Sequence, residues 1–303
     1  MNLSVRIRLL DMAIRLLRGV EQALDTLGWD RVYTPPRTGE AFYSHDLTEA
    51  QLASYQKNQG QTNDCAVYAV AAALNLLADT KSRRRKRGAE PAGDEAALPL
   101  RGFSGLVDYD SAVAVASQRA ILRGDLLGGL GDFLGGRDLR MWPGGPLMPR
   151  QQAALARQLS QQYRLPVTAV ATRGSTDDLL FFLRQPNAEV LVTLGWGLRH
   201  RPRIQHPDGK LRPFNPPDSI SVAGRAIHLP FGAHVMLLAA YDPAHTAKEG
   251  RKSIAAPWGF INSWVDGGES LYWMPEDDFC RAWRYVIPGV GRQKMVVIRR
   301  VGR

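Results

Sequence analysis

An apolar stretch at residues 66 to 78, reading AVYAVAAALNLLA, stands out in the pattern of hydrophobic and polar positions along the chain. It is rich in alanine and leucine and apolar almost all round, which predicts a helix buried on every side. Asn63 and Asp64 just before it are good N-cap residues, so we expect the helix to begin at about Cys65. The polar residues from Gly60 onward predict a turn in front of it.

Residues 1 to 45 are predicted to form an amphipathic helical extension, ahead of a domain at residues 46 to 303. Apolar residues recur every three or four positions from Leu9 to Leu27, and arginines interrupt them. Those arginines exclude a secretory signal sequence and a membrane span, so we expect a cytoplasmic protein and leave open secretion without a signal peptide. Packing of the helix against the domain is the expectation, and contact with a membrane surface is the alternative.

Shorter elements are predicted along the rest of the chain. Helices are expected at about residues 104 to 122, 149 to 163, 175 to 185 and 276 to 283, with a short one after Thr48. The glycine-rich segment between the first two should be irregular. Strand patterns occur at residues 165 to 171 and 188 to 196. Cys280, in the last helix, is expected to be a buried structural residue.

Two further strand-like runs, HVMLLAAY from His234 and WGFINSW from Trp258, predict an antiparallel hairpin with a long polar connection. We expect His234 to lie directly opposite Asn262, so that Asn Oδ1 accepts a hydrogen bond from one ring nitrogen and the other is aimed at a thiol. Trp264 is expected to screen that bond from water. The same register places on one face His234, Met236, Leu238 and Ala240, together with Asn262, Phe260 and Trp258.

Composition indicates a globular protein, because 303 residues of which 45% are hydrophobic can build one large core or two small ones. Its two cysteines give neither a disulfide framework nor a metal-ligand spacing. The formal net charge is +10, and the run Lys81 to Arg87 holds six of the basic residues, inside a predicted basic loop at residues 80 to 98. No aromatic residues are interleaved to stack on bases, so a solvated loop is favoured over a nucleic-acid contact. A processing site for a trypsin-like enzyme is a third interpretation.

A proline-rich insert at residues 198 to 231 leads to His234. It carries six basic residues, which are Arg199, Arg201, Arg203, Lys210, Arg212 and Arg225. Loops of this length are usually functional or disordered. We expect the insert to favour a protein or peptide substrate with acidic residues near the reacting bond, and solvated arginines that only keep the loop soluble are the alternative.

Cys65 is the candidate nucleophile. At the start of a helix, unpaired backbone N-H groups and the helix dipole favour a thiolate over a thiol. Gln59 stands six positions earlier, and the turn between them can bring its side-chain NH2 beside the sulfur. With the Cys65 backbone N-H it would form a donor pair for an oxyanion, which acyl transfer requires. A lone cysteine in an apolar helix is more often a buried structural residue, so the assignment of Cys65 as nucleophile depends on the other candidate residues of the chain.

With these residues in place, the sequence resembles the papain-like cysteine peptidases. QGQTNDC is similar to the family's Gln-Gly-x4-Cys segment, HVMLLAAYD to its histidine strand, and INSW to its Asn-Ser-Trp. The helix at 175 to 185 and the closing PEDDFCRAW are similar to the bacterial C39-like branch, which usually has Asp where this chain has Asn262.

The resemblance implies an α+β fold in two parts, a helical half that carries the cysteine helix and an antiparallel half that carries His234 and Asn262. It implies a hydrolase in which Cys65 is the nucleophile, His234 the general base and acid, Asn262 the orienting residue and Gln59 the oxyanion donor, without metal or cofactor. Two alternatives stay open: an acyl or amide transferase of the same fold, and a catalytically silent scaffold that binds acidic partners.

Overall fold

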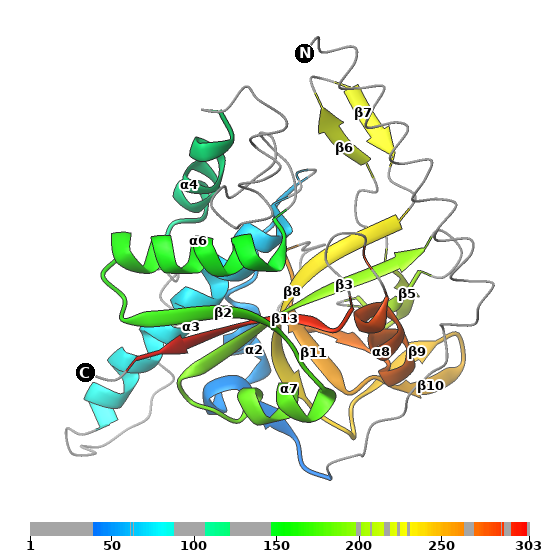
Figure 1. Ribbon diagram of the computed structural model, residues 1–303. Coiled ribbons are helices and arrows are strands. Elements are labelled where there is room, and N and C mark those ends of the chain that lie inside the picture. Colours follow the sequence, from blue (N-terminus) through cyan, green and yellow to red (C-terminus); the bar gives the residue numbers. More distant parts are fainter. Residues whose placement is uncertain are drawn as a thin grey trace.

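The structure of the protein is a computed structural model, shown in Figure 1. It describes residues 39–60, 62, 64–87, 107–121, 147–197, 201–206, 208–214, 219–222, 225–228, 231–263, 270–285, 287 and 292–301. Most of the predicted extension at residues 1 to 45 therefore lies outside the described residues. Its described end includes a short strand of the main sheet, β1.

An antiparallel sheet forms the centre of the molecule. Its strands run in the order β2-β13-β3-β8-β11-β12-β4-β5, and β1 pairs with β8 beside that path. The bounds are β1 Phe42–Tyr43, β2 Val167–Arg173, β3 Ala188–Gly197, β4 Arg203–Gln205, β5 Leu211–Pro213, β8 Phe231–Tyr241, β11 Trp258–Ile261, β12 Tyr272–Met274 and β13 Lys294–Arg300. Two separate hairpins are β6 Ser219–Val222 with β7 Arg225–His228, and β9 Thr246–Glu249 with β10 Lys252–Ala255.

Helices cover both faces of this sheet (Figure 1). Their bounds are η1 Ser44–Asp46, α2 Glu49–Ala53, α3 Cys65–Arg87, α4 Tyr109–Ile121, α6 Pro149–Gln162, α7 Thr176–Leu183 and α8 Glu276–Arg284. Strand β3 separates two cores, because Leu191 packs with α3 and α6 while Val190 and Val192 pack with α7 and α8. The described structure is thus a mixture of helices and antiparallel sheet, as predicted for the α+β class.

Helix α3 is the buried helix that the apolar stretch predicts. Its residues from Ala66 to Leu77 are almost all buried. Asn75, at 0% exposure, is the polar exception, and its side chain binds both the N-H and the carbonyl of Val107 at 2.8 and 3.1 Å. These two bonds satisfy a polar group that would otherwise be costly to bury, and they attach the chain before α4 to α3.

The prediction of a loop from residue 80 was wrong for its first part, because the backbone of Lys81 to Arg87 continues α3. Lysine and arginine are good helix formers, and no proline or glycine interrupts the chain before Gly88. The remainder of the predicted loop, residues 88 to 98, lies outside the part of the chain that the structure describes.

Local signals predicted the other helices well. Ser175 caps α7 in a capping box, since its Oγ accepts from Asp178 N at 3.2 Å and the Asp178 carboxylate accepts from Ser175 N at 2.7 Å. Thr48 caps α2 in the same manner with Gln51. The expected irregular segment before α6 lies mostly outside the described residues.

The insert at residues 198 to 231 is not simply a loop, which corrects the sequence interpretation. Its first half forms β4 and β5, and Gln205 of β4 pairs with Trp273 of β12, so this hairpin extends the main sheet. Its second half forms the separate hairpin β6-β7.

Candidate active site

His234 lies near the start of β8, where it pairs with Leu194 of β3. Its side chain points to the same face as Met236 and Leu238, which belong to the core under α7 and α8. The residue is only 2% exposed. The strand therefore delivers a titratable ring into a mostly apolar environment.

Asn262 follows directly after β11, but the predicted register was wrong. Phe260 pairs with Leu238 and Ile261 with Leu237, so the next position of the ladder falls at Met236 rather than at His234. His234 and Asn262 are therefore diagonal neighbours, two residues out of line. Such neighbours still lie on one face and within reach of each other's side chains.

A β-bulge determines which residues share that face. The register shifts between Gly259 and Phe260, because Gly259 pairs with Ala240 and Phe260 with Leu238, which leaves Ala239 as an extra residue in β8. Ala240 consequently packs in the core under α3 and α6. Tyr241 instead lies on the face that was predicted for Ala240, in the core under α7 and α8. Beyond the bulge, the faces of His234 and Asn262 agree as predicted.

The predicted hydrogen bond between the two side chains is present. His234 Nε2 and Asn262 Oδ1 are 2.8 Å apart, and the bond is buried. An amide oxygen can only accept, so Nε2 carries the proton, and in the neutral ring Nδ1 is then the acceptor nitrogen. Asn262 thus selects one tautomer of His234.

Burial also sets the charge of the ring. It lowers the pKa of His234 to about 4, and the hydrogen bond to Asn262 opposes this shift without cancelling it. The histidine is therefore neutral at pH 7, with an acceptor nitrogen that can take a proton.

Gln59 is fixed against the strand that carries Asn262. Its backbone N-H donates to Ser263 O at 2.8 Å, and its side-chain Oε1 accepts a hydrogen bond from Ser263 Oγ. Its Nε2 donates to Thr62 O at 2.6 Å, which closes the turn that leads to the cysteine helix. Gly60, with φ of +64°, supplies the left-handed residue of this turn.

Cys65 is the first residue of α3 and is half-buried. Tyr68 N donates to Asp64 O at 3.0 Å, so Asp64 occupies the N-cap position and Cys65 the first helical position. Helix α3 packs on β8, the strand of His234. The structure thus joins His234 directly to Asn262, and it joins Gln59 to the residue after Asn262 and to the turn before Cys65.

Gln56 is a buried residue of this region that sequence reasoning missed. Its Oε1 accepts from Asn262 N at 3.2 Å and its Nε2 donates to Ser270 O at 3.0 Å. Glu49 binds the next two groups, since its Oε1 accepts from Leu271 N and from the indole of Trp273, both at 3.0 Å. The only signal in the sequence was a second glutamine three residues before Gln59.

Trp264, predicted to screen the His–Asn bond, lies outside the described residues. Cys280 is 1% exposed, as predicted, and its pKa is raised well above the usual range by burial and by the carboxylate of Glu276, to which its Sγ lies at 3.4 Å.

Ion pairs occupy two of the basic residues of the insert. Arg203 binds Asp278 of α8 and Glu249 of β9, at 2.8 and 2.7 Å, and Arg212 pairs with Asp208. Arg201 and Lys210 are exposed, and the side chains of Arg199 and Arg225 lie outside the described part. Arg203 therefore has a structural contact that the substrate-steering interpretation did not foresee.

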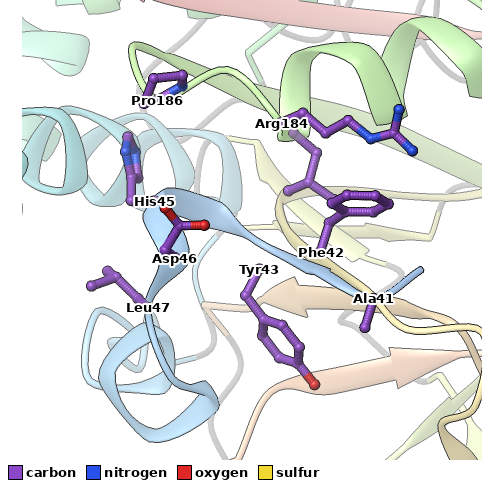
Figure 2. Close-up of a pocket in the computed structure, with 9 residues that line it drawn as sticks. Ala41, Phe42, Tyr43, His45, Asp46, Leu47, Arg184 and Pro186 are labelled. Atoms are coloured by element: carbon purple, nitrogen blue, oxygen red, sulfur yellow. The ribbon is translucent and has the colours of Figure 1, made fainter.

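A surface cavity of about 490 Å³ lies at the other end of β8, where β1 pairs with Tyr241 (Figure 2). His45 lines it with a left-handed backbone, φ 58°, and its ring is bound to the buried carboxylate of Glu189. Burial lowers the pKa of His45, but the charge and hydrogen bond of Glu189 outweigh burial and raise it overall.

Arg184 also lines this cavity, and its guanidinium lies over the Phe42 ring at 4.0 Å. At about 3.3 Å per residue along β8, this cavity is distant from His234.

The described residues contain no group of three or more His, Cys, Asp or Glu side chains that could hold a metal ion. Nor do they include a helix of the length and apolarity needed to cross a membrane.

Comparison with known proteins finds similarity in structure but not in sequence. No family model matches the sequence, and no curated protein matches it. Among solved structures, the chain is similar to one described as a "putative C39-like peptidase" from Bacillus anthracis, with 12% identity, a TM-score of 0.40, and coverage of 87% of this chain and 98% of that one.

Proposed function

We propose that this chain is a cysteine peptidase that hydrolyses a peptide or isopeptide bond, with Cys65, His234 and Asn262 as its catalytic residues. The observation that carries the proposal is the buried hydrogen bond of 2.8 Å between His234 Nε2 and Asn262 Oδ1. It orients the ring and leaves Nδ1 as an acceptor, which is the state that a general base needs. Burial keeps His234 neutral at pH 7, so Nδ1 starts the reaction unprotonated, and the hydrogen bond to Asn262 offsets part of the cost of charging the ring.

In the proposed reaction, His234 Nδ1 takes the proton of the Cys65 thiol while the sulfur attacks the carbonyl carbon of the amide. The tetrahedral oxyanion is bound by the Cys65 backbone N-H and by Gln59 Nε2. His234 then gives its proton to the leaving nitrogen, the C–N bond breaks, and a thioester remains on Cys65. Water, deprotonated by His234, attacks the thioester and releases a carboxylic acid and the free thiol.

Two contacts support the parts assigned to Gln59 and Asn262. An amide group has two N-H donors, and Thr62 O takes one from Gln59 at 2.6 Å, which leaves a second for an oxyanion. Asn262 Oδ1 accepts from the ring in both protonation states of His234, so it lowers the cost of the buried imidazolium that forms during the reaction.

The test is alkylation of the two cysteines, followed by an assay of peptide cleavage. We expect Cys65 to react with iodoacetamide much faster than Cys280 at neutral pH, because one is half-buried at a helix start and the other is buried with a raised pKa. Peptide mapping after brief labelling measures both. Equal labelling of the two cysteines, or labelling of Cys280 alone, would contradict the assignment.

Activity is then measured on a proteome-derived peptide library by mass spectrometry. Cys65→Ala should abolish cleavage, and Cys280→Ala is the matched control that should retain it. Adding hydroxylamine separates the alternatives, because a transferase would give mainly hydroxamate products and a hydrolase mainly new carboxyl termini. A scaffold would give no product and an unreactive Cys65.

A further inference from the structure

Phe214, which follows β5 in the insert, packs against the ring of His234. The two ring centroids are 5.0 Å apart at 74° between planes, an edge-to-face arrangement. Trp196 of β3 also packs against Phe214, at 5.5 Å and 61°. All three side chains are buried, at 3%, 2% and 5% exposure for Phe214, His234 and Trp196. Phe214 is therefore part of the wall that excludes water from the histidine.

This contact requires the sheet to curl. Three strands, β11, β12 and β4, lie between β8 and β5 in the strand order. The end of β5 nevertheless reaches His234, so the outer part of the sheet returns over the face of β8. Phe214 N donates to Pro202 O at 2.8 Å, which continues the β4-β5 pairing by one position and fixes the backbone that carries the aromatic ring.

An ion pair fixes that hairpin on α8. Arg203, at the start of β4, donates from Nε and Nη2 to Asp278 Oδ2 at 2.9 and 2.8 Å, and its backbone N-H donates to Asp278 Oδ1 at 3.1 Å. Its Nη1 donates to Glu249 Oε1 at 2.7 Å. Charge-assisted bonds of this kind restrict orientation as well as adding energy. One arginine of the insert thus acts inside the fold, on the element that presents Phe214.

The backbone of β8 is shaped for the same aromatic group. Gly232 lies two residues before His234, and a Cβ there would be only 2.2 Å from the Trp196 ring. Glycine at this position lets the indole approach the strand closely. Trp196 in turn contacts Phe214, so both aromatic side chains are held in place beside β8.

We propose that the β4-β5 hairpin is a positioning element of the site, which holds Phe214 against the ring of His234 and so keeps that ring dry and turned toward Asn262. The insert then has a role that its charge did not indicate. Its catalytic meaning rests on the proposed function, but its effect on the histidine ring does not.

The low pKa of His234 agrees with this role. Burial is the larger cause and lowers it, and the bond to Asn262 opposes the change. Removing Phe214 lets water reach the ring, so the charged form should become easier to make.

The test is an NMR titration of His234 in the full chain. It is made in a Cys65→Ala background, so that a thiol cannot couple to the histidine. With Phe214→Ala the titration midpoint should rise by at least about one pH unit towards 6.5. Phe182→Ala is the matched control, because Phe182 is a partly buried phenylalanine at the same core, and it should leave the midpoint unchanged.

Two further variants keep the test decisive. If Phe214→Ala does not fold, Phe214→Leu retains an apolar side chain without the ring and should give a smaller rise in the same direction. Arg203→Gln should also raise the midpoint, because it loosens the hairpin without touching the histidine. An unchanged midpoint in a folded Phe214 variant, or an equal rise with Phe182→Ala, would overturn the proposal.

This outcome is independent of the peptidase assignment. If Cys65 proves unreactive while the midpoint of His234 still rises with Phe214→Ala, the proposed function fails and the positioning role stands. If cleavage occurs, the Phe214 variant with Cys65 intact should lose kcat with little change in KM, because it disturbs the base rather than substrate binding.

Discussion

The buried histidine should make the stability of the protein depend on pH in a predictable direction. The change to test is His234→Gln, since the amide NH2 of glutamine can take over the donor that Nε2 gives to Asn262 Oδ1. Wild type and variant should then have similar folds, and they should differ in how the free energy of unfolding responds to acid.

The direction of the pH dependence follows from which state, folded or unfolded, binds the proton of His234 more readily. Between about pH 4 and 6.5 the folded protein keeps His234 neutral while the unfolded chain protonates it, so acid favours unfolding. The contribution is fully present above pH 6.5 and is lost as pH falls through about 4. A pKa drop from 6.5 to about 4, at about 1.4 kcal/mol per pH unit, corresponds to roughly 3 kcal/mol in total.

Urea unfolding at several pH values from 7 to 4.5 measures this contribution as the difference between wild type and variant. Taking the difference removes other groups, including His45, whose raised pKa gives stability below pH 6.5 that is lost at higher pH. The wild type should lose stability faster than His234→Gln as pH falls. Parallel curves for the two proteins would refute the claim that burial keeps His234 neutral.

Two further predictions concern residues that support the site. Gln56→Met keeps a side chain of similar length but removes both the acceptor for Asn262 N and the donor to Ser270 O, so it should destabilise the protein by about 1–3 kcal/mol in urea unfolding; no change would mean that these two bonds contribute nothing. Gly232→Ala should lower stability by at least about 1 kcal/mol in thermal unfolding, because its Cβ would meet Trp196 at 2.2 Å. Gly39→Ala, where a Cβ meets nothing within 4 Å, is the control, and an equal effect at both glycines would contradict the reasoning.

Elements that depend on neighbouring residues could be predicted from the sequence. The Cys65 helix follows from its alanine and leucine content, and the start of α7 follows from the Ser175 cap with Asp178. The end of α3 was missed because charge was taken as a sign of a loop, although lysine and arginine favour helix as much as most residues do. The charge of a segment indicates that its side chains are solvated, whereas helix propensity indicates which backbone conformation the segment adopts.

Contacts that depend on the curl of the sheet could not be predicted. Strands β4 and β5 have three residues each, too few for an alternating pattern to be recognised. The contact between Phe214 and His234 then depends on strands far apart in the chain. Gln56 was missed for the same reason, since its partners Asn262 and Ser270 lie more than two hundred residues along the chain.

The His–Asn bond formed although its predicted register was wrong, and the reason is the period of a strand. A slip of two residues leaves every side chain on its original face, whereas a slip of one moves it to the other. At the start of β11, Trp258 pairs with Tyr241, which differs from the predicted register by an odd number of residues. The bulge after Gly259 changes this difference to two residues, so the faces of the two strands agree again at Asn262. Register was poorly determined because the connection between the strands is long and forms its own hairpin, β9-β10, instead of a tight turn. The face, and not the exact pairing, is therefore what brings His234 to Asn262.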